Sequence, residues 1–331
     1  MSEALPSWRD AGAPAPVRVE MEALRAALDA GVPPKRAANR NLLIGTWNIK
    51  AFASLSEKWT AGGSDSPKRD WRALWAITEI VSRFDVIAIQ EIKGDLRALR
   101  TMMKTLGPSW NFLMTDVTRG DAGNDERMGF IFDTGRVQLS GLAGELVIPE
   151  DWEKVIPSGA LQRQFARTPY AVSFRAGSDT FVLTTLHVDY GTSSAGRIPE
   201  LRGIAEWLDG WANQLNAWGQ NFIALGDFNI DRQTDDLWTA FTSTGLTVPA
   251  ALDAVRRSIF ASESEPQKEK YYDQIAWFET GSRRKLNLDY VTGGGVDFVP
   301  HLYSELGMSR ASMQHRLSDH YPLWVEFNCR S

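Results

Sequence analysis

Apolar runs of strand length recur along most of the chain, and stretches with helical spacing of apolar residues lie between them. Many runs are apolar at consecutive positions, which is typical of strands covered on both faces. The expected strands occupy residues 42–49, 84–89, 129–132, 137–149, 171–174, 181–187, 221–225, 274–278, 288–292 and 321–327.

Helical spacing predicts helices over residues 19–30, 70–82, 95–106, 199–217 and 235–243. No repeat and no long linker interrupts residues 41–328, so residues 41–331 are expected to form one domain. Residues 1–40 are expected to be an N-terminal extension with one helix, which packs on the domain or serves a partner interface. Strands outnumber helices, which predicts an α/β protein with two packed mixed β-sheets and helices on their outer faces.

Composition and charge narrow the class of protein. The chain has 331 residues, of which 43% are hydrophobic, so a large core can form. Its 36 basic and 41 acidic residues give a net charge of −5, which is unlike the basic balance of most nucleic-acid-binding domains but allows a local basic groove. A single cysteine, Cys329, excludes an internal disulfide. With no signal-peptide pattern and no run long enough to span a bilayer, we expect a cytoplasmic protein.

Polar side chains of a few types stand at the ends of the apolar strands. They are Asn48, Glu91, His187, Asp227, Asn229, Asp273, Asp319 and His320. Each alone fits a turn or a cap. Because the pattern recurs with only Asn, Asp, Glu and His, we expect these strand ends to come together in one site.

These residue types suit water attack on a phosphodiester. That reaction needs a base, neutralisation of charge on the phosphoryl oxygens and help for the leaving oxygen. Asn48 and Glu91 offer hard oxygen ligands, which favour Mg²⁺ or Mn²⁺ over zinc. A histidine beside a carboxylate can take a proton from water while the carboxylate fixes its tautomer.

Five segments in order resemble the motifs of the endonuclease/exonuclease/phosphatase superfamily. They are Thr46-Trp47-Asn48-Ile49, Ile89-Gln90-Glu91, Leu186-His187, Gly226-Asp227-Phe228-Asn229 and Ser318-Asp319-His320-Tyr321-Pro322. The resemblance covers residues 41–327 and implies a four-layer αββα sandwich. The deoxyribonuclease I branch is the most similar, through Tyr271-Tyr272-Asp273-Gln274-Ile275, Glu126-Arg127-Met128-Gly129-Phe130 and Arg167-Thr168-Pro169.

The resemblance implies a role for each site residue. His187 and His320 are the expected catalytic histidines, Asp227 and Asn229 would orient water and phosphate, and Asp273 would support His187. Asp319 would support His320 or hold metal, and Asn48 with Glu91 would bind the ion. Arg127 and Arg167 are expected to contact the phosphate of the substrate. Tyr190, in the loop after His187, either touches a nucleotide or is a plain loop residue.

Alternatives remain at this stage. Asp289-Tyr290 competes with Asp273 for the supporting role, and Gln274 stands where the nuclease has arginine. The expected activity is a metal-dependent DNA endonuclease, with DNA preferred over RNA as substrate. A phosphatase or phosphodiesterase acting on a small molecule or a lipid head group is the alternative, and a non-catalytic scaffold is a second one.

Overall fold

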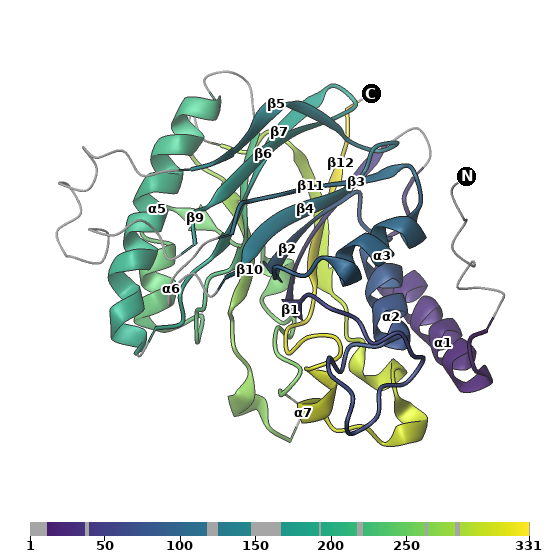
Figure 1. Ribbon diagram of the computed structural model, residues 1–331. Coiled ribbons are helices and arrows are strands. Elements are labelled where there is room, and N and C mark those ends of the chain that lie inside the picture. Colours follow the sequence, from purple (N-terminus) through teal and green to yellow (C-terminus); the bar gives the residue numbers. More distant parts are fainter. Residues whose placement is uncertain are drawn as a thin grey trace.

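The computed structural model places two six-stranded sheets face to face, with helices on both outer faces (Figure 1). The structure describes residues 12–36, 40–117, 125–146, 167–191, 193–216, 221–261, 264–281 and 285–330. The predicted αββα sandwich is therefore confirmed. Of the predicted elements, residues 147–149 and residue 217 lie outside the described residues.

The first sheet has the strand order β11-β12-β1-β2-β4-β3. Only β1 and β2 run parallel in it, and all its other neighbours are antiparallel. Its strands are β1 (Asn41–Phe52), β2 (Val86–Ile92), β3 (Trp110–Met114), β4 (Arg127–Asp133), β11 (Asp289–Gly295) and β12 (Leu323–Asn328).

The second sheet has the order β5-β6-β7-β8-β10-β9. It likewise contains one parallel pair, β7 with β8, among antiparallel neighbours. Its strands are β5 (Gln138–Glu145), β6 (Tyr170–Ala176), β7 (Asp179–His187), β8 (Asn221–Asp227), β9 (Leu246–Thr247) and β10 (Asp273–Phe278). Each sheet therefore has a central parallel pair, and β1, β7 and β8 bring polar residues to the same end of the sandwich.

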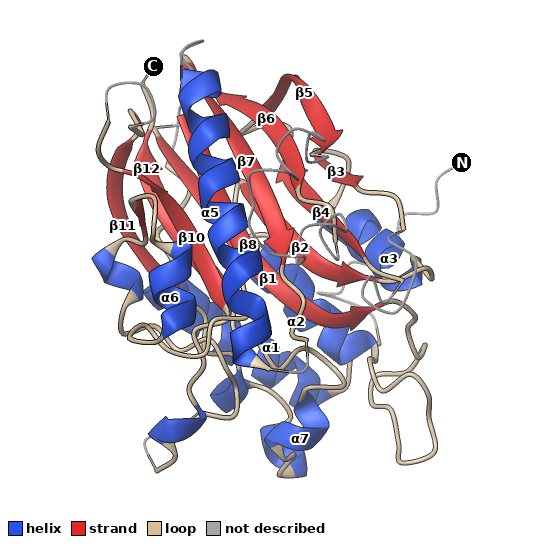
Figure 2. Ribbon diagram, turned by 90° about the vertical axis from the view of Figure 1, so that its left-hand side faces the viewer, coloured by secondary structure: helices blue, strands red, loops and turns tan. Residues whose placement is uncertain are grey.

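The helices form the two outer layers. The first layer, on the first sheet, contains α1 (Ala15–Gly31), α2 (Trp71–Val81) and α3 (Arg97–Leu106). The second contains α5 (Ser194–Asn216) and α6 (Asp236–Phe241), and α5 runs along the outer face of the second sheet (Figure 2). The short helix α7 (Arg310–Met313) lies among the loops at one end (Figure 2). None of the described helices combines the length and the apolar character that crossing a bilayer requires.

Helix α1 of the N-terminal extension packs against the first sheet and its helices. Its buried stripe, which includes Met21, Leu24 and Leu28, joins the core between the first sheet and its helices. On the same helix, the buried carboxylate of Glu20 accepts hydrogen bonds from Arg72 on α2. The described part of the extension, residues 12–36, is therefore packed onto the domain.

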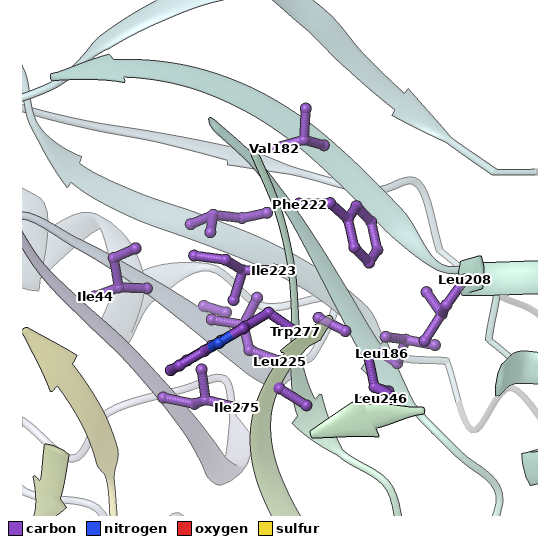
Figure 3. Close-up of a cluster of buried hydrophobic side chains, with 14 of the residues drawn as sticks. Ile44, Val182, Leu186, Leu208, Phe222, Ile223, Leu225, Leu246, Ile275 and Trp277 are labelled. Atoms are coloured by element: carbon purple, nitrogen blue, oxygen red, sulfur yellow. The ribbon is translucent and has the colours of Figure 1, made fainter. Parts of the chain in front are cut away.

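The core between the sheets is apolar and closely interdigitated. Ile44 from β1 lies beside Ile223, Leu225 and Ile275 from the second sheet (Figure 3). Because successive strand residues face opposite sides, each strand that is covered on both faces reads as a continuous apolar run. This explains why the strand predictions succeed for the central strands.

The sequence does not predict β3 and β9. β3 is an edge strand without a continuous buried face, and β9 has only two residues, so neither has a periodic signal. The glycines Gly293–Gly295 lie beyond the predicted strand 288–292, yet they pair with β12 inside β11. A Cβ on Gly294 would lie 2.7 Å from the Trp324 ring, so the glycine makes room for that side chain.

Candidate active site

One pocket of about 450 Å³ opens at the ends of the central strands. Its walls come from both sheets and from the loops that follow them. All the residues predicted from sequence, except Arg127 and Asp273, line it. The lining residues are Asn48, Glu91, Glu126, Arg167, His187, Asp189, Tyr190, Asp227, Asn229, Tyr272, Asp319 and His320.

Asp227 lies at the centre of this pocket. It ends β8, where it pairs in register with His187 of β7 on one side and Asp273 of β10 on the other. Its Oδ1 accepts a hydrogen bond from the Asn229 backbone N–H at 2.9 Å, and its Oδ2 accepts one from Asn48 Nδ2 at 3.0 Å. These two donors fix the orientation of the carboxylate.

Gly226 allows β7 and β8 to approach at this point. Its φ is +138°, and a Cβ there would lie 2.1 Å from the carbonyl oxygen of Leu186. Only glycine adopts this conformation without a clash. The glycine of the Gly-Asp-Phe-Asn motif therefore sets the position of Asp227 relative to His187.

The first histidine, His187, is paired with Glu126. Nδ1 of His187 lies 3.2 Å from Oε2 of Glu126, which also contacts Arg167 Nε at 2.7 Å, and Lys93 Nζ donates to Oε1 at 2.8 Å. Burial by itself raises the pKa of Glu126, but the attraction of His187, Arg167 and Lys93 outweighs burial and lowers it to about 2. Glu126 is therefore an anion that holds the His187 ring.

The second histidine, His320, is paired with Asp273. Its Nδ1 lies 2.6 Å from Asp273 Oδ2, and the side chain of Asp273 is fully buried. Burial raises the pKa of Asp273 to about 6, although the charge and hydrogen bond of His320 lower it. Burial lowers the pKa of His320, but the charges of Asp273 and Asp227 outweigh burial and raise it well above 6.5. The expected pairing of Asp273 with His187 is thus wrong.

The reason for that error is the sheet register. Asp273 starts β10, and the facing loop before β12 places His320, not His187, over its carboxylate. His187 on β7 instead faces the start of β4, where Glu126 lies. Asp319 makes no direct hydrogen bond to His320 in the described structure and pairs with Lys50 Nζ at 2.8 Å.

Each histidine–carboxylate pair therefore joins one sheet to the other. The Nε2 atoms of both histidines point to Asp227, at 3.7 Å for His187 and 3.9 Å for His320 from its Oδ2. The two free ring nitrogens and one carboxylate thus surround one small volume. A phosphate and an attacking water placed there would be within reach of both rings.

Arg127 does not join this pocket. Along β4, Phe130 and Phe132 face the core between the sheets, whereas Ile131 faces the helices. By alternation, Glu126 shares the face of Phe130 and Arg127 shares the face of Ile131. Arg127 donates to the Lys93 carbonyl at 3.2 Å. Counting two-residue steps along the predicted strand could have selected Glu126 from the sequence.

The oxygen ligands predicted for a divalent ion all line this pocket. Asn48 Oδ1 is buried and has no hydrogen-bond partner among the described residues, while its Nδ2 donates to Asp227. Glu91 lies in a bulge of β2 with φ +61°, and its Oε2 accepts from the Ala51 N–H at 2.8 Å. An orphaned amide oxygen beside the carboxylates of Glu91 and Asp319 fits a hard cation.

The balance of charge in the pocket also fits a cation. Its lining contains one guanidinium, on Arg167, and five carboxylates: Glu91, Glu126, Asp189, Asp227 and Asp319. A phosphodiester anion entering such a pocket is repelled unless positive charge accompanies it. A second grouping, of Asp227, Asp273 and His320, has ligand atoms within 4.8 Å of one another. Within that group, His320 and Asp273 are already hydrogen-bonded to each other.

Arg69 supports the loops around the site and carries no signal in the sequence. It is buried, and its guanidinium donates to the carbonyl oxygens of Lys50, Ala51, Arg316 and Leu317 at 2.6 to 3.1 Å. The first two lie near the end of β1, and the last two precede Asp319. One side chain therefore ties the end of β1, where the Ala51 N–H contacts Glu91, to the loop that carries Asp319.

Tyr190 lies at the rim of the pocket, and Asp289 lies on β11. Tyr190 is 53% exposed at the pocket rim, where it lies over Arg197 and against the ring of Tyr272. Asp289 is exposed on β11 and accepts from Asn328 Nδ2 at 2.7 Å. Asp273, and not Asp289, is therefore the aspartate next to a site histidine.

Comparison with known proteins gives a consistent picture. The model of the endonuclease/exonuclease/phosphatase family matches residues 45–320. A deoxyribonuclease from Thioalkalivibrio sp. (strain K90mix) is 28% identical over 299 residues, which cover 88% of this chain and 72% of that protein.

Solved structures share the fold at lower identity. A mannosyl-6-phosphatase from Bacteroides thetaiotaomicron has a TM-score of 0.57 at 18% identity, covering 87% of this chain and 100% of that one. TDP2 from D. rerio, complexed with a single-strand DNA product, has a TM-score of 0.54 at 13% identity, covering 87% and 99%. These similarities concern the architecture of the sandwich.

Proposed function

The chain belongs to the endonuclease/exonuclease/phosphatase family, and from this premise we propose that it is a divalent-metal-dependent phosphodiesterase that cleaves DNA as an endonuclease. One observation supports this above the others. Two histidines, each held by its own buried carboxylate, direct their free nitrogens to Asp227 in a pocket that also contains hard oxygen ligands. That arrangement suits the attack of water on a phosphoester.

In this proposal His187 is the base for the attacking water. The Glu126 carboxylate beside Nδ1 keeps the proton there, which leaves the Nε2 lone pair directed toward the centre of the pocket. Asp227, fixed by Asn48 and Asn229, orients the water between itself and the ring. Placing the water and the base in fixed geometry lowers the entropic part of the barrier.

His320 is proposed to act on the phosphate. Asp273 fixes its ring through Nδ1, so that Nε2 can donate a hydrogen bond to a phosphoryl or leaving oxygen. Trp47 holds the same segment by donating its indole N–H to the His320 carbonyl at 2.8 Å. The backbone and the ring of His320 are therefore both fixed before substrate arrives.

We propose that Asn48, Glu91 and Asp319 hold Mg²⁺ or Mn²⁺. Such an ion supplies positive charge to the phosphoryl and leaving oxygens. Arg167, anchored by Glu126, contributes the protein's own positive charge in the same pocket. Tyr190 at the rim is proposed to contact the nucleotide.

DNA is proposed as the substrate because the relative with the strongest sequence similarity described above is named a deoxyribonuclease. The test is nicking of supercoiled plasmid with Mg²⁺, Mn²⁺ or Ca²⁺. We expect cleavage with Mg²⁺ or Mn²⁺, its loss with chelator, and its loss in Asp227→Ala. Chelator-resistant cleavage, or full activity of Asp227→Ala, would refute the mechanism.

The alternative substrate is a small phosphoester, which the net charge of −5 favours, because duplex binding depends on basic residues. Competition between plasmid DNA and small phosphoesters at several salt concentrations separates the two. The cytoplasmic location stays a prediction.

A further inference from the structure

A second pocket, of about 480 Å³, adjoins the catalytic pocket. The two share Tyr272, Asp319 and His320 in their walls. One ligand can therefore contact His320 and extend into the second pocket. The other residues that line it are Ser258, Phe260, Gln267, Lys268 and Lys270.

The two pockets have opposite charge. The catalytic pocket is lined by five carboxylates and one guanidinium, whereas the second is lined by two lysines and one carboxylate. That carboxylate, Asp319, is already paired with Lys50 at 2.8 Å. The lining of the second pocket therefore has more cationic than anionic side chains, although the chain as a whole is acidic.

The second pocket also offers aromatic surface. Phe260 is half-buried in its wall, and Tyr272 stands between the two pockets with its ring 5.7 Å from the His320 ring. Aromatic side chains bind nucleobases by stacking, and lysines bind phosphate as point charges. A nucleotide carries a base and a phosphate on one sugar. The aromatic ring and the lysines of the second pocket complement these two groups.

The lysines differ in how firmly they are held. Lys270 is paired with Asp231 at 2.6 Å, and Asp231 is also bound by Arg197. Lys268 is half-exposed and pairs with the exposed Glu265 at 2.6 Å. An exposed ion pair of this kind contributes little, so Lys268 can exchange its partner for a phosphate.

We propose that the second pocket binds the nucleotide adjacent to the scissile phosphate. Its base lies against Phe260, and its outer phosphate contacts Lys268 and Lys270. This assignment depends on the phosphodiesterase function proposed above, and it adds the part of the substrate that is recognised outside the reacting group.

The experiment uses dinucleotides that contain a single phosphodiester: TpT, pTpT and TpTp. One terminal phosphate, at the end that enters the second pocket, should lower KM about tenfold relative to TpT. We expect Lys268→Ala to remove this advantage and Lys268→Arg to keep it. Phe260→Ala should raise KM for all three substrates about tenfold, with kcat within about twofold of wild type.

Arg175→Ala is the matched control. Arg175 is an exposed cation on β6, opposite Thr180 near the start of β7 and therefore at the far end of the sheet from His187. It should leave KM and kcat unchanged for every substrate. Lys268→Ala should also reduce the salt dependence of log KM for the favoured dinucleotide by roughly 0.7 per log unit, which a structural defect would not do.

Several results would overturn the assignment. If Phe260→Ala and Lys268→Ala match Arg175→Ala, or lower kcat rather than raise KM, the pocket does not bind the neighbouring nucleotide. Equal KM values for TpT, pTpT and TpTp in the wild type would also refute it. A wild-type protein that nicks no plasmid would refute the proposed function itself, and the pocket's assignment with it.

Discussion

The two histidine–carboxylate pairs look alike but are built differently. Glu126, the partner of His187, also contacts Arg167 and Lys93, so its charge is balanced by several cations. Asp273, the partner of His320, is completely buried, and the one side-chain hydrogen bond described for its carboxylate is to His320.

The pKa values of the two carboxyl groups follow this difference. Glu126 has a pKa lowered to about 2, and Asp273 has a pKa raised to about 6 by burial. A buried charge with one partner depends on that partner, whereas a shared charge does not. Asp273 and His320 should therefore act as a unit, and Glu126 should connect His187 to Arg167, which we proposed as a source of positive charge for the substrate.

The largest expected effect comes from removing either ring. His187→Ala and His320→Ala should each lower kcat by about 10³-fold, the usual size of a general acid or base contribution. Far-UV circular dichroism should show an unchanged fold, with steady-state cleavage of plasmid as the readout. If either variant retains a rate within a few-fold of wild type, that histidine has no part in the proton transfers.

Replacing each carboxylate by its amide separates the two pairs. Asp273→Asn should lower kcat by about 10²-fold with KM unchanged, because only the His320 ring depends on it. Glu126→Gln should lower kcat by a similar factor and also raise KM, because Arg167 loses its anchor. The same KM in both variants would show that Glu126 does not couple the histidine to substrate binding.

These pairings mark the limit of what the sequence can predict. The site residues could be found because each is a polar side chain at the end of an apolar strand, which is a local signal. Which carboxylate meets which histidine depends on contacts between the two sheets, which no local pattern encodes. The sequence therefore pairs Asp273 with His187, whereas the structure pairs it with His320.

Other residues escaped prediction for different reasons. The resemblance of the Glu126-Arg127 segment predicts Arg127 as the site residue, because similarity of a segment does not say which of two neighbours faces the pocket. Arg69 binds four carbonyl oxygens from the end of β1 and from the distant loop before Asp319, a role set only by the folded chain. The fold class could be predicted from the sequence, because the strands that are buried on both faces have continuous apolar runs.

The smallest expected effect is on the pH dependence of the free energy of unfolding, and it comes from Glu126. The pKa of Glu126 is lowered in the folded state from 4.5 to about 2, so its contribution is present above pH 4.5 and is lost as the pH falls toward 2. The free energy of unfolding of the wild type should therefore fall relative to Glu126→Gln by about 2 kcal/mol between pH 6 and pH 3. Urea unfolding at a series of pH values measures this gap. A gap that stays constant over that range would mean that Arg167 and Lys93 do not hold the Glu126 charge in solution, and the contrast between the two pairs would disappear.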